Sequence, residues 1–222
     1  MKIENIKACV FDAYGTLFDV NSAAAKCKEK LGSKWEGFAN AWRTTQLEYT
    51  WLRSLMKKHK NFWEITEDSL DHTMETFKIK KEMKNELLNL YKELSPYPEV
   101  KECLEGLKSK KIKIAILSNG TPDLLEGLVE SNNIKNYFDD IMSVETVGVY
   151  KPDSKVYEMP IKKYNCKPEN ICFMSSNTWD VSGGGVFGYN AVWINRFNKV
   201  FDKLSYKPKF VIKNLKELLN II

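Results

Sequence analysis

The sequence predicts an α/β fold in which a parallel sheet carries helices on both faces and a helical segment is inserted after the first strand. Three observations predict it. A short apolar run ends on a carboxylate at residue 12. Residues 22–94 show helical patterns without strand-like alternation. From residue 98 onward, apolar runs alternate with helical patterns, as in a parallel sheet.

The first strand is predicted at 7–12, because its unbroken apolar run fits a strand buried on both faces. Asp12 closes the run and Gly15 permits a turn. An Asp at the carboxyl end of a buried strand lies where open α/β sheets bind their ligands. Asp and Gly are also common turn residues, so Asp12 could equally serve only as a cap.

The inserted segment is predicted to hold helices at 22–31, 34–60, 66–77 and 81–94, bounded by Pro96 and Pro98. The second helix carries a broad apolar stripe made of Phe38, Trp42, Leu47, Trp51, Leu52 and Leu55. We place the core domain at 1–16 and 97–222, and the four-helix insertion at 17–96.

The rest of the chain is predicted to alternate. Helices are expected at 100–110, 122–130, 153–164 and 215–219, and strands at 112–117, 140–144, 171–174, 191–194 and 210–212. Pro160 predicts a kink or an early end in the third of these helices.

Composition limits the partners that we expect. The chain has 222 residues, of which 43% are hydrophobic, so it can build a core. Its net charge of +5 comes from lysines spread along the chain, which is typical of a solvated surface rather than a nucleic-acid patch. A modest positive potential can still gather small anionic substrates.

The cysteines indicate a cytoplasmic protein. They are odd in number, five, and include no Cys-x-x-Cys pair, so we expect all of them to be reduced: Cys9, Cys27, Cys103, Cys166 and Cys172. Charged residues interrupt the first apolar segment, so no signal peptide is visible. No apolar run approaches the ~20 residues that span a bilayer, so no membrane association is expected.

Three predicted strands end in polar side chains, which suggests a shared site. They end at Asp12, at Ser118-Asn119, and at Ser175-Ser176-Asn177. Because the carboxyl ends of parallel strands meet at one edge, these groups can converge. Lys151 lies in the loop after the strand at 140–144 and can join them.

The run from Asp12 to Leu17, Asp-x-Tyr-Gly-Thr-Leu, resembles the nucleophile motif of the haloacid dehalogenase superfamily. Most members are phosphatases with a second Asp, the general acid, where this chain has Tyr14. A halide is a weak base and leaves without a proton. The resemblance therefore points to the (S)-2-haloacid dehalogenase branch, and it covers nearly the whole chain.

The resemblance implies a Rossmann-like core, a helical cap and hydrolytic dehalogenation of small (S)-2-haloalkanoic acids to (R)-2-hydroxy acids. It implies that Asp12 attacks carbon 2 with inversion, forming a covalent aspartyl ester. Lys151 would keep Asp12 ionised. Arg43 would receive the halide with Asn119, although an arginine beside tryptophans is often only packed or salt-bridged.

Further roles follow from the same resemblance. Ser118 and the backbone amides of Ala13 and Tyr14 would hold the substrate carboxylate. Thr16, Ser175 and Tyr157 would support the catalytic cluster. Leu47, Phe62 and Trp179 would line the apolar side of the substrate, although each could be plain core.

The run Ser175-Ser-Asn-Thr-Trp-Asp180 bears on cofactors. Asn177 stands where the phosphatases have an acidic magnesium ligand, and hard cations prefer anionic oxygens, so no metal or other cofactor is expected. Asp180 would orient Lys151 or activate the hydrolytic water.

The glycines of 183–188 formally fit Gly-x-Gly-x-x-Gly, but they begin well after a strand, and the next strand ends at Asn195. They favour a loosely wound helix start packed closely on the sheet over a nucleotide site.

Two alternatives stay open: a phosphatase or phosphonate-cleaving enzyme of the same fold, and a non-catalytic small-anion binding protein. The expected partners are a small haloacid and its halide product. The resemblance also implies homodimers, which family members often form.

Overall fold

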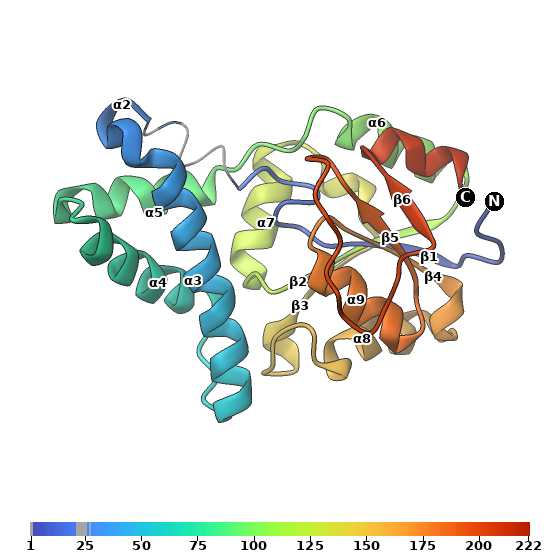
Figure 1. Ribbon diagram of the computed structural model, residues 1–222. Helices are drawn as coiled ribbons and strands as arrows, with labels where there is room; N and C mark the ends of the chain where they lie inside the picture. Colours follow the sequence, from blue (N-terminus) through green and yellow to red (C-terminus); the bar gives the residue numbers. More distant parts are fainter. Residues whose placement is uncertain (1, 21–25, 27) are drawn as a thin grey trace. The chain divides into compact units, whose positions relative to one another are not determined.

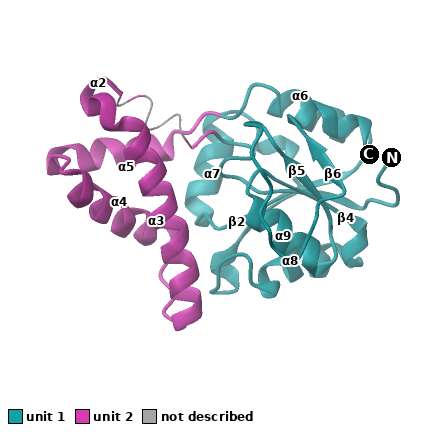
Figure 2. Cartoon of the chain, viewed as in Figure 1, with its two compact units in different colours: residues 1–18, 96–222 teal, residues 19–95 magenta. Residues whose placement is uncertain are grey.

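The computed structural model describes residues 2–20, 26 and 28–222. The chain divides into two compact units, Met1–Phe18 with Pro96–Ile222 and Asp19–Ser95 (Figure 2).

The first unit is built on a six-stranded parallel sheet in the order β3-β2-β1-β4-β5-β6 (Figure 1). Its strands are β1 (Ala8–Phe11), β2 (Lys113–Ser118), β3 (Asp140–Ser143), β4 (Ile171–Ser175), β5 (Asn190–Ile194) and β6 (Phe210–Ile212). The order reverses at β1, where Val10 pairs with Ala115 of β2 and with Phe173 of β4. Every residue of β1 is buried, which explains its unbroken apolar run.

Helices cover both faces of this sheet, as predicted. They are α6 (Val100–Ser109), α7 (Pro122–Ser131), α8 (Ser154–Tyr164), α9 (Thr178–Phe187) and the 3₁₀ segment η6 (Leu215–Asn220). The helix α6 packs with η6 over one face, while α8 and α9 lie together on the other (Figure 1). Short 3₁₀ turns complete the connections: η3 (Lys135–Tyr137), η4 (Val144–Thr146) and η5 (Pro168–Asn170).

The second unit is helical. It contains α2 (Lys28–Leu31), α3 (Trp35–Met56), α4 (Phe62–Phe77) and α5 (Lys84–Lys92), with 3₁₀ turns η1 (Gly32–Lys34) and η2 (Lys81–Met83). Its interior includes ring contacts of Phe38 with Phe77, at 5.8 Å between centroids, and of Trp42 with Tyr91, at 5.6 Å. The predicted helix at 22–31 lies partly outside the described residues.

Two expectations for this unit were wrong. The helix α4 begins at Phe62 and not at Thr66, because Asn61 and Glu64 form a reciprocal capping box. The buried face of α3 consists of Phe38, Trp42, Gln46 and Thr50, whereas Leu52 and Leu55 of the predicted stripe are 50% and 80% exposed. Polar Gln46 can be buried because its amide donates to Thr66 Oγ1 at 2.7 Å.

In the first unit, the early helix end that Pro160 allowed does not occur. The helix α8 continues through Pro160, because Val156, Tyr157 and Pro160 form its buried face and this packing offsets one missing hydrogen bond. The last segment, expected as a helix at 215–219, is 3₁₀ rather than α-helical, and α9 is a helix for which no bounds were predicted.

The four described cysteines, Cys9, Cys103, Cys166 and Cys172, are free thiols, while Cys27 lies outside the described residues. Cys9 of β1 and Cys172 of β4 are register partners in adjacent strands, and both are buried, as their apolar context predicts. Among the helices that the structure describes, none combines the length and apolarity of a membrane span.

Candidate active site

Asp12 directly follows β1, at the edge where the strand order reverses, and its side chain is almost buried. Its amide donates to the carbonyl of Met174 at 2.9 Å, which extends the pairing with β4. The chain then turns at Gly15, whose φ of +84° strains any other residue. Ser176 Oγ donates to the Gly15 carbonyl at 2.6 Å and so fixes this turn.

Hydrogen-bond donors surround the Asp12 carboxylate. Its Oδ1 accepts from Lys151 Nζ at 3.1 Å. Its Oδ2 accepts from Thr16 Oγ1 at 3.0 Å, Asn177 Nδ2 at 2.9 Å and Ser175 Oγ at 3.4 Å. The predicted cluster at the strand ends is therefore present, and it is built to stabilise an ionised, oriented carboxylate.

Lys151 connects Asp12 to a second carboxylate. Its Nζ lies 2.9 Å from Asp180 Oδ2, and its side chain is 1% exposed. Its backbone amide donates to Asn119 Oδ1 at 3.1 Å, which fixes the loop that carries it. Burial disfavours the ammonium, but Asp12 and Asp180 outweigh this effect and raise the pKa of Lys151. Lys151 is therefore a cation near neutral pH.

Asp180 is a weaker acid than an ordinary aspartate. Burial, together with the charge on Asp12, raises its pKa to about 6, against the opposing effects of Lys151 and Tyr157. Tyr157 Oη donates to Asp180 Oδ1 at 2.8 Å. Burial and Asp180 raise the pKa of Tyr157 well above its usual value, so this hydroxyl is a donor.

Glycines in the second half of α9 bring Asp180 to the cluster. A Cβ on Gly183 would lie 2.5 Å from Tyr157 Oη, and one on Gly184 would lie 2.8 Å from the ring of Phe173. The close packing expected of this glycine run is confirmed. The expected position at a helix start was wrong, because α9 begins at Thr178.

Two of the predicted substrate-binding residues on this unit are hydrogen-bonded to the cluster: Asn119 Oδ1 accepts from Lys151 N, and the Tyr14 carbonyl accepts from Asn177 Nδ2 at 3.3 Å. Ser118 Oγ accepts from Gly120 N at 3.1 Å. The ring of Tyr14 packs against Gly120, where a Cβ would lie 2.8 Å from it. Ala13 directly follows Asp12, and Trp179 is the second residue of α9.

The other predicted contacts belong to the second unit. Arg43 on α3 donates from Nη1 to Gln46 Oε1 at 2.9 Å. The amide nitrogen of Gln46 also contacts Tyr91 Oη at 3.1 Å. Leu47 follows on α3 and Phe62 begins α4. These hydrogen bonds connect Arg43 through Gln46 to Tyr91 on α5.

The groups around Asp12 do not suit a divalent cation. Its carboxylate faces the ammonium of Lys151 and the amide of Asn177, whereas hard cations need several converging oxygens. Within residues 2–20, 26 and 28–222, no group of three His, Cys, Asp or Glu side chains has the arrangement of a metal site.

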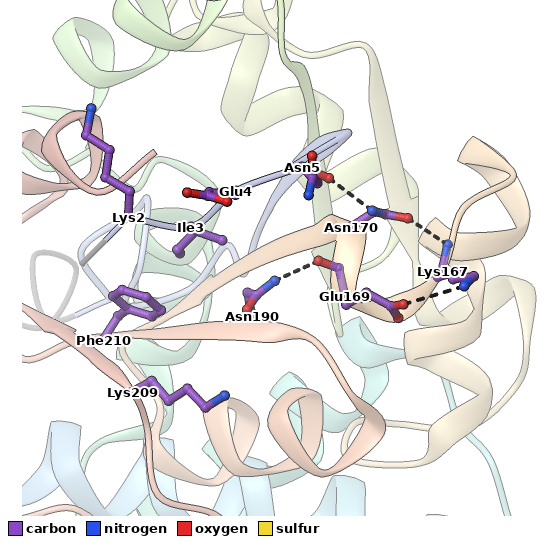
Figure 3. Close-up of a pocket in the computed structure, with 10 residues that line it drawn as sticks. All are labelled: Lys2, Ile3, Glu4, Asn5, Lys167, Glu169, Asn170, Asn190, Lys209 and Phe210. Atoms are coloured by element: carbon purple, nitrogen blue, oxygen red, sulfur yellow. Dashed lines mark hydrogen bonds and ion pairs between the residues drawn. The ribbon is translucent and has the colours of Figure 1, made fainter.

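A cavity of about 600 Å³ lies at the opposite edge of the sheet (Figure 3). Its lining includes Asn190 and Phe210, the first residues of β5 and β6, so it is at the amino ends of the strands. Lys167 and Glu169 give it charges of both signs. It is therefore separate from the cluster around Asp12.

Two residues that hold Thr16 had no predicted role: Ser176, which was expected only as one of the polar residues at the strand ends, and Arg196, which was not singled out. Ser176 N donates to Thr16 Oγ1 at 2.9 Å, and Arg196 Nη2 donates to the Thr16 carbonyl at 2.9 Å. Arg196 follows β5, so the rule applied to the other strand ends would have found it if extended to the strand at 191–194.

Known proteins resemble this chain over nearly its whole length. Residues 6–188 match the family of haloacid dehalogenase-like hydrolases. The (S)-2-haloacid dehalogenase 1 of Pseudomonas sp. (strain CBS-3) is 40% identical over 223 residues, covering 99% of this chain and 98% of that protein. The (S)-2-haloacid dehalogenase of Pseudomonas fluorescens is 42% identical over 220 residues, covering 98% and 97%.

Solved structures agree. The L-2-haloacid dehalogenase from Xanthobacter autotrophicus, with chloropropionic acid covalently bound, has a TM-score of 0.90 at 32% identity, covering 97% of each chain. A further dehalogenase crystal structure has a TM-score of 0.96 at 36% identity, covering 99% of this chain and 98% of that one. The chain therefore belongs to the haloacid dehalogenase-like hydrolases and, within them, to the family of the (S)-2-haloacid dehalogenases.

Proposed function

We propose that this protein hydrolyses small (S)-2-haloalkanoic acids to (R)-2-hydroxy acids through an ester on Asp12. The observation that carries the proposal is the environment of Asp12, in which a buried ammonium, an amide and two hydroxyls bind one carboxylate. Such a group is an oriented anion that can act as a nucleophile.

In the first step, an oxygen of Asp12 attacks carbon 2 opposite the halogen. A carbon–oxygen bond forms while the carbon–halogen bond breaks, and the halide leaves with the bonding electron pair. Thr16, Ser175 and Asn177 bind Oδ2. We therefore assign the attack to Oδ1, which Lys151 holds.

Other residues would bind the substrate. Ser118 and the amides of Ala13 and Tyr14 would take its carboxylate, while Arg43 and Asn119 would take the halide, whose charge develops in the transition state. Residues 17–96 would form the cap that carries Arg43. From it Leu47 and Phe62 would join Trp179 in lining the apolar side and excluding water from the first step.

In the second step, water attacks the ester carbonyl carbon of Asp12. The hydroxy acid leaves and the carboxylate is restored. Asp180 is suited to accept a proton from this water, because its pKa of about 6 makes it a stronger base than an ordinary carboxylate. Lys151 and Tyr157 would orient it.

The test is a single turnover in heavy-oxygen water with enzyme in excess of (S)-2-chloropropanoate. Ester hydrolysis places the label in Asp12 and leaves the first product unlabelled. Direct attack by water on carbon 2 would instead label that product and overturn the mechanism. Mass spectrometry of the peptide that contains Asp12 distinguishes ester hydrolysis from direct attack by water.

Substrate class and nucleophile are tested separately. We expect halide release from the (S) acid but not from its (R) enantiomer, with (R)-lactate as the product. Asp12→Ala should abolish halide release, whereas Asp123→Asn, at an exposed position of α7, should leave it unchanged. Full turnover by Asp12→Ala would contradict the proposal, as would release of phosphate from simple phosphate esters as the main activity.

A further inference from the structure

Arg196 is a buried cation outside the proposed set of catalytic residues. It follows β5, at the same edge of the sheet as Asp12, and its side chain is 8% exposed. Its Nη1 forms an ion pair with Glu99, and its Nη2 donates to the carbonyl of Thr16 at 2.9 Å. A guanidinium is suited to bind two acceptors in one plane.

The flat face of the Arg196 guanidinium also packs on an aromatic ring, that of Tyr97. Its central carbon lies 3.8 Å from the centroid of the Tyr97 ring. The amide of Tyr97 donates to the carbonyl of Leu17 at 2.9 Å, one residue beyond Thr16. Arg196 and Tyr97 therefore hold two consecutive backbone carbonyls, those of Thr16 and Leu17.

Glu99 keeps Arg196 in place. Burial tends to raise the pKa of Glu99, but Arg196 and backbone donors outweigh this effect and lower it. Its Oε1 also accepts from the amide of Leu215 at 3.4 Å. The carboxylate thus stays ionised near neutral pH and binds the arginine to α6 and η6.

Thr16 connects this group to the proposed nucleophile. Its carbonyl accepts from Arg196, while its hydroxyl donates to Asp12 Oδ2 at 3.0 Å and accepts from Ser176 N. Backbone and hydroxyl share one α-carbon, so a movement of the carbonyl moves the hydroxyl as well. The path from Arg196 to Asp12 therefore passes through a single residue.

We propose that Arg196 is a positioning residue for the attack of Asp12, and that it acts by holding the backbone of Thr16. This inference rests on the proposed function, because the step it assists is formation of the aspartyl ester.

The first test is Arg196→Lys, which keeps a charge for Glu99 but loses the planar fork. We expect single-turnover ester formation to slow about tenfold, with KM changed less than about twofold, because misplacing a reacting group affects chemistry more than binding. Arg53→Lys is the matched control. Arg53 pairs with Asp68 at 2.9 Å on the helical unit, and this substitution should leave the rate unchanged.

The second test is a pair of double variants. If Arg196 acts through Thr16, adding Arg196→Lys to Thr16→Val should slow ester formation by less than twofold. The same substitution added to Ser175→Ala should still slow it about tenfold. Equal slowing in both backgrounds would mean general structural damage and would overturn the inference.

The third measurement needs no activity. Hydrogen exchange at the Ser176 amide, which donates to Thr16 Oγ1, should be at least about threefold faster in Arg196→Lys and unchanged in Arg53→Lys. Unchanged exchange in Arg196→Lys would overturn the inference. If the wild type releases no halide, the proposed function fails, and this exchange measurement still decides whether Arg196 holds Thr16.

Discussion

Nζ of Lys151 lies 2.9 Å from Oδ2 of Asp180, and the two side chains are 1% and 0% exposed. The same ammonium also binds Asp12, so one cation serves two buried carboxylates. Burial is the main reason why the pKa of Asp180 is raised despite its ion pair, and the charge on Asp12 adds to this effect. Lys151 stabilises the site and opposes this rise in the pKa of Asp180, which would be larger without the ammonium.

Replacement of Lys151 by Met should impair both activity and stability. Methionine has a similar length but no charge, so two carboxylates stay buried without their cation. We expect ester formation to slow about 10²–10³-fold and the free energy of unfolding at pH 7 to fall by about 3–5 kcal/mol. Rapid-quench kinetics and urea unfolding measure the two effects.

Lys108→Met is the control for Lys151→Met. Lys108 binds Asp139 at 3.1 Å, and its side chain is 37% exposed. Loss of such a pair should cost at most about 1 kcal/mol and leave the rate unchanged. Equal effects of the two substitutions would contradict the role of Lys151.

Stability should depend on pH through Asp180. Its pKa is raised from 3.8 to about 6 in the folded protein, so the folded state binds a proton more tightly than the unfolded state. This contribution to stability is fully present below pH 4 and is lost as the pH rises through about 6. The shift corresponds to about 3 kcal/mol.

The measurement compares wild type with Asp180→Asn in urea unfolding from pH 4.5 to 7.5. The wild type should lose stability relative to the variant as the pH rises across this window. A relative gain would mean that the ion pair with Lys151 dominates and that the pKa of Asp180 is lowered.

Asn177→Asp should replace an amide donor by a carboxylate oxygen, which would join the oxygens of Asp12 and of the Tyr14 carbonyl. The amide nitrogen of Asn177 lies 2.9 Å from Asp12 Oδ2 and 3.3 Å from the Tyr14 carbonyl. With a carboxylate there, two anions and a carbonyl converge, which favours a hard cation. We expect dehalogenation to fall at least about 100-fold and Mg²⁺ binding to appear by calorimetry.

Asn190→Asp adds the same charge at the other edge of the sheet and serves as the control. It should change neither activity nor Mg²⁺ binding. If both variants bind Mg²⁺ equally, the effect is one of net charge and the geometric argument fails.

Much of the site could be predicted from strand ends. Asp12, Ser175 and Asn177 each end or follow an apolar run, and parallel strands bring their carboxyl ends together. Lys151 was proposed from its place in the loop after the strand at 140–144 and from the family resemblance, because a loop lysine has no periodic signal. The contacts of Tyr157 were likewise not readable, since they depend on how α8 and α9 pack.

The errors have local causes. The start of α4 was placed at Thr66 because Thr66-Glu-Asp-Ser offers a possible N-cap, whereas the capping box that begins the helix is at Asn61. The stripe on α3 was misjudged because polar Gln46 and Thr50 are buried there, while Leu55 is exposed. Apolarity alone cannot find a polar residue that is buried by virtue of its hydrogen bonds.

Close packing of α9 predicts the outcome of Gly183→Ala. The new methyl group would lie 2.5 Å from Tyr157 Oη and 2.8 Å from Cβ of Pro152. We expect a loss of about 1–3 kcal/mol in the free energy of unfolding, because neither neighbour can move freely. Displacement of Tyr157 from Asp180 should also slow ester hydrolysis, which single-turnover kinetics measures separately from ester formation.

Gly127→Ala is the matched control, because Gly127 lies inside α7 and its new methyl group has no neighbour within 4 Å. The free energy of unfolding of this variant should rise by about 0.5–1 kcal/mol, because alanine is more favourable than glycine inside a helix. Tyr157→Phe removes the atom nearest to Gly183, so it should make Gly183→Ala less damaging. If the stability losses of the two substitutions simply added, the clash of Gly183→Ala would be with Pro152. The argument that Gly183→Ala acts by displacing Tyr157 would then fail.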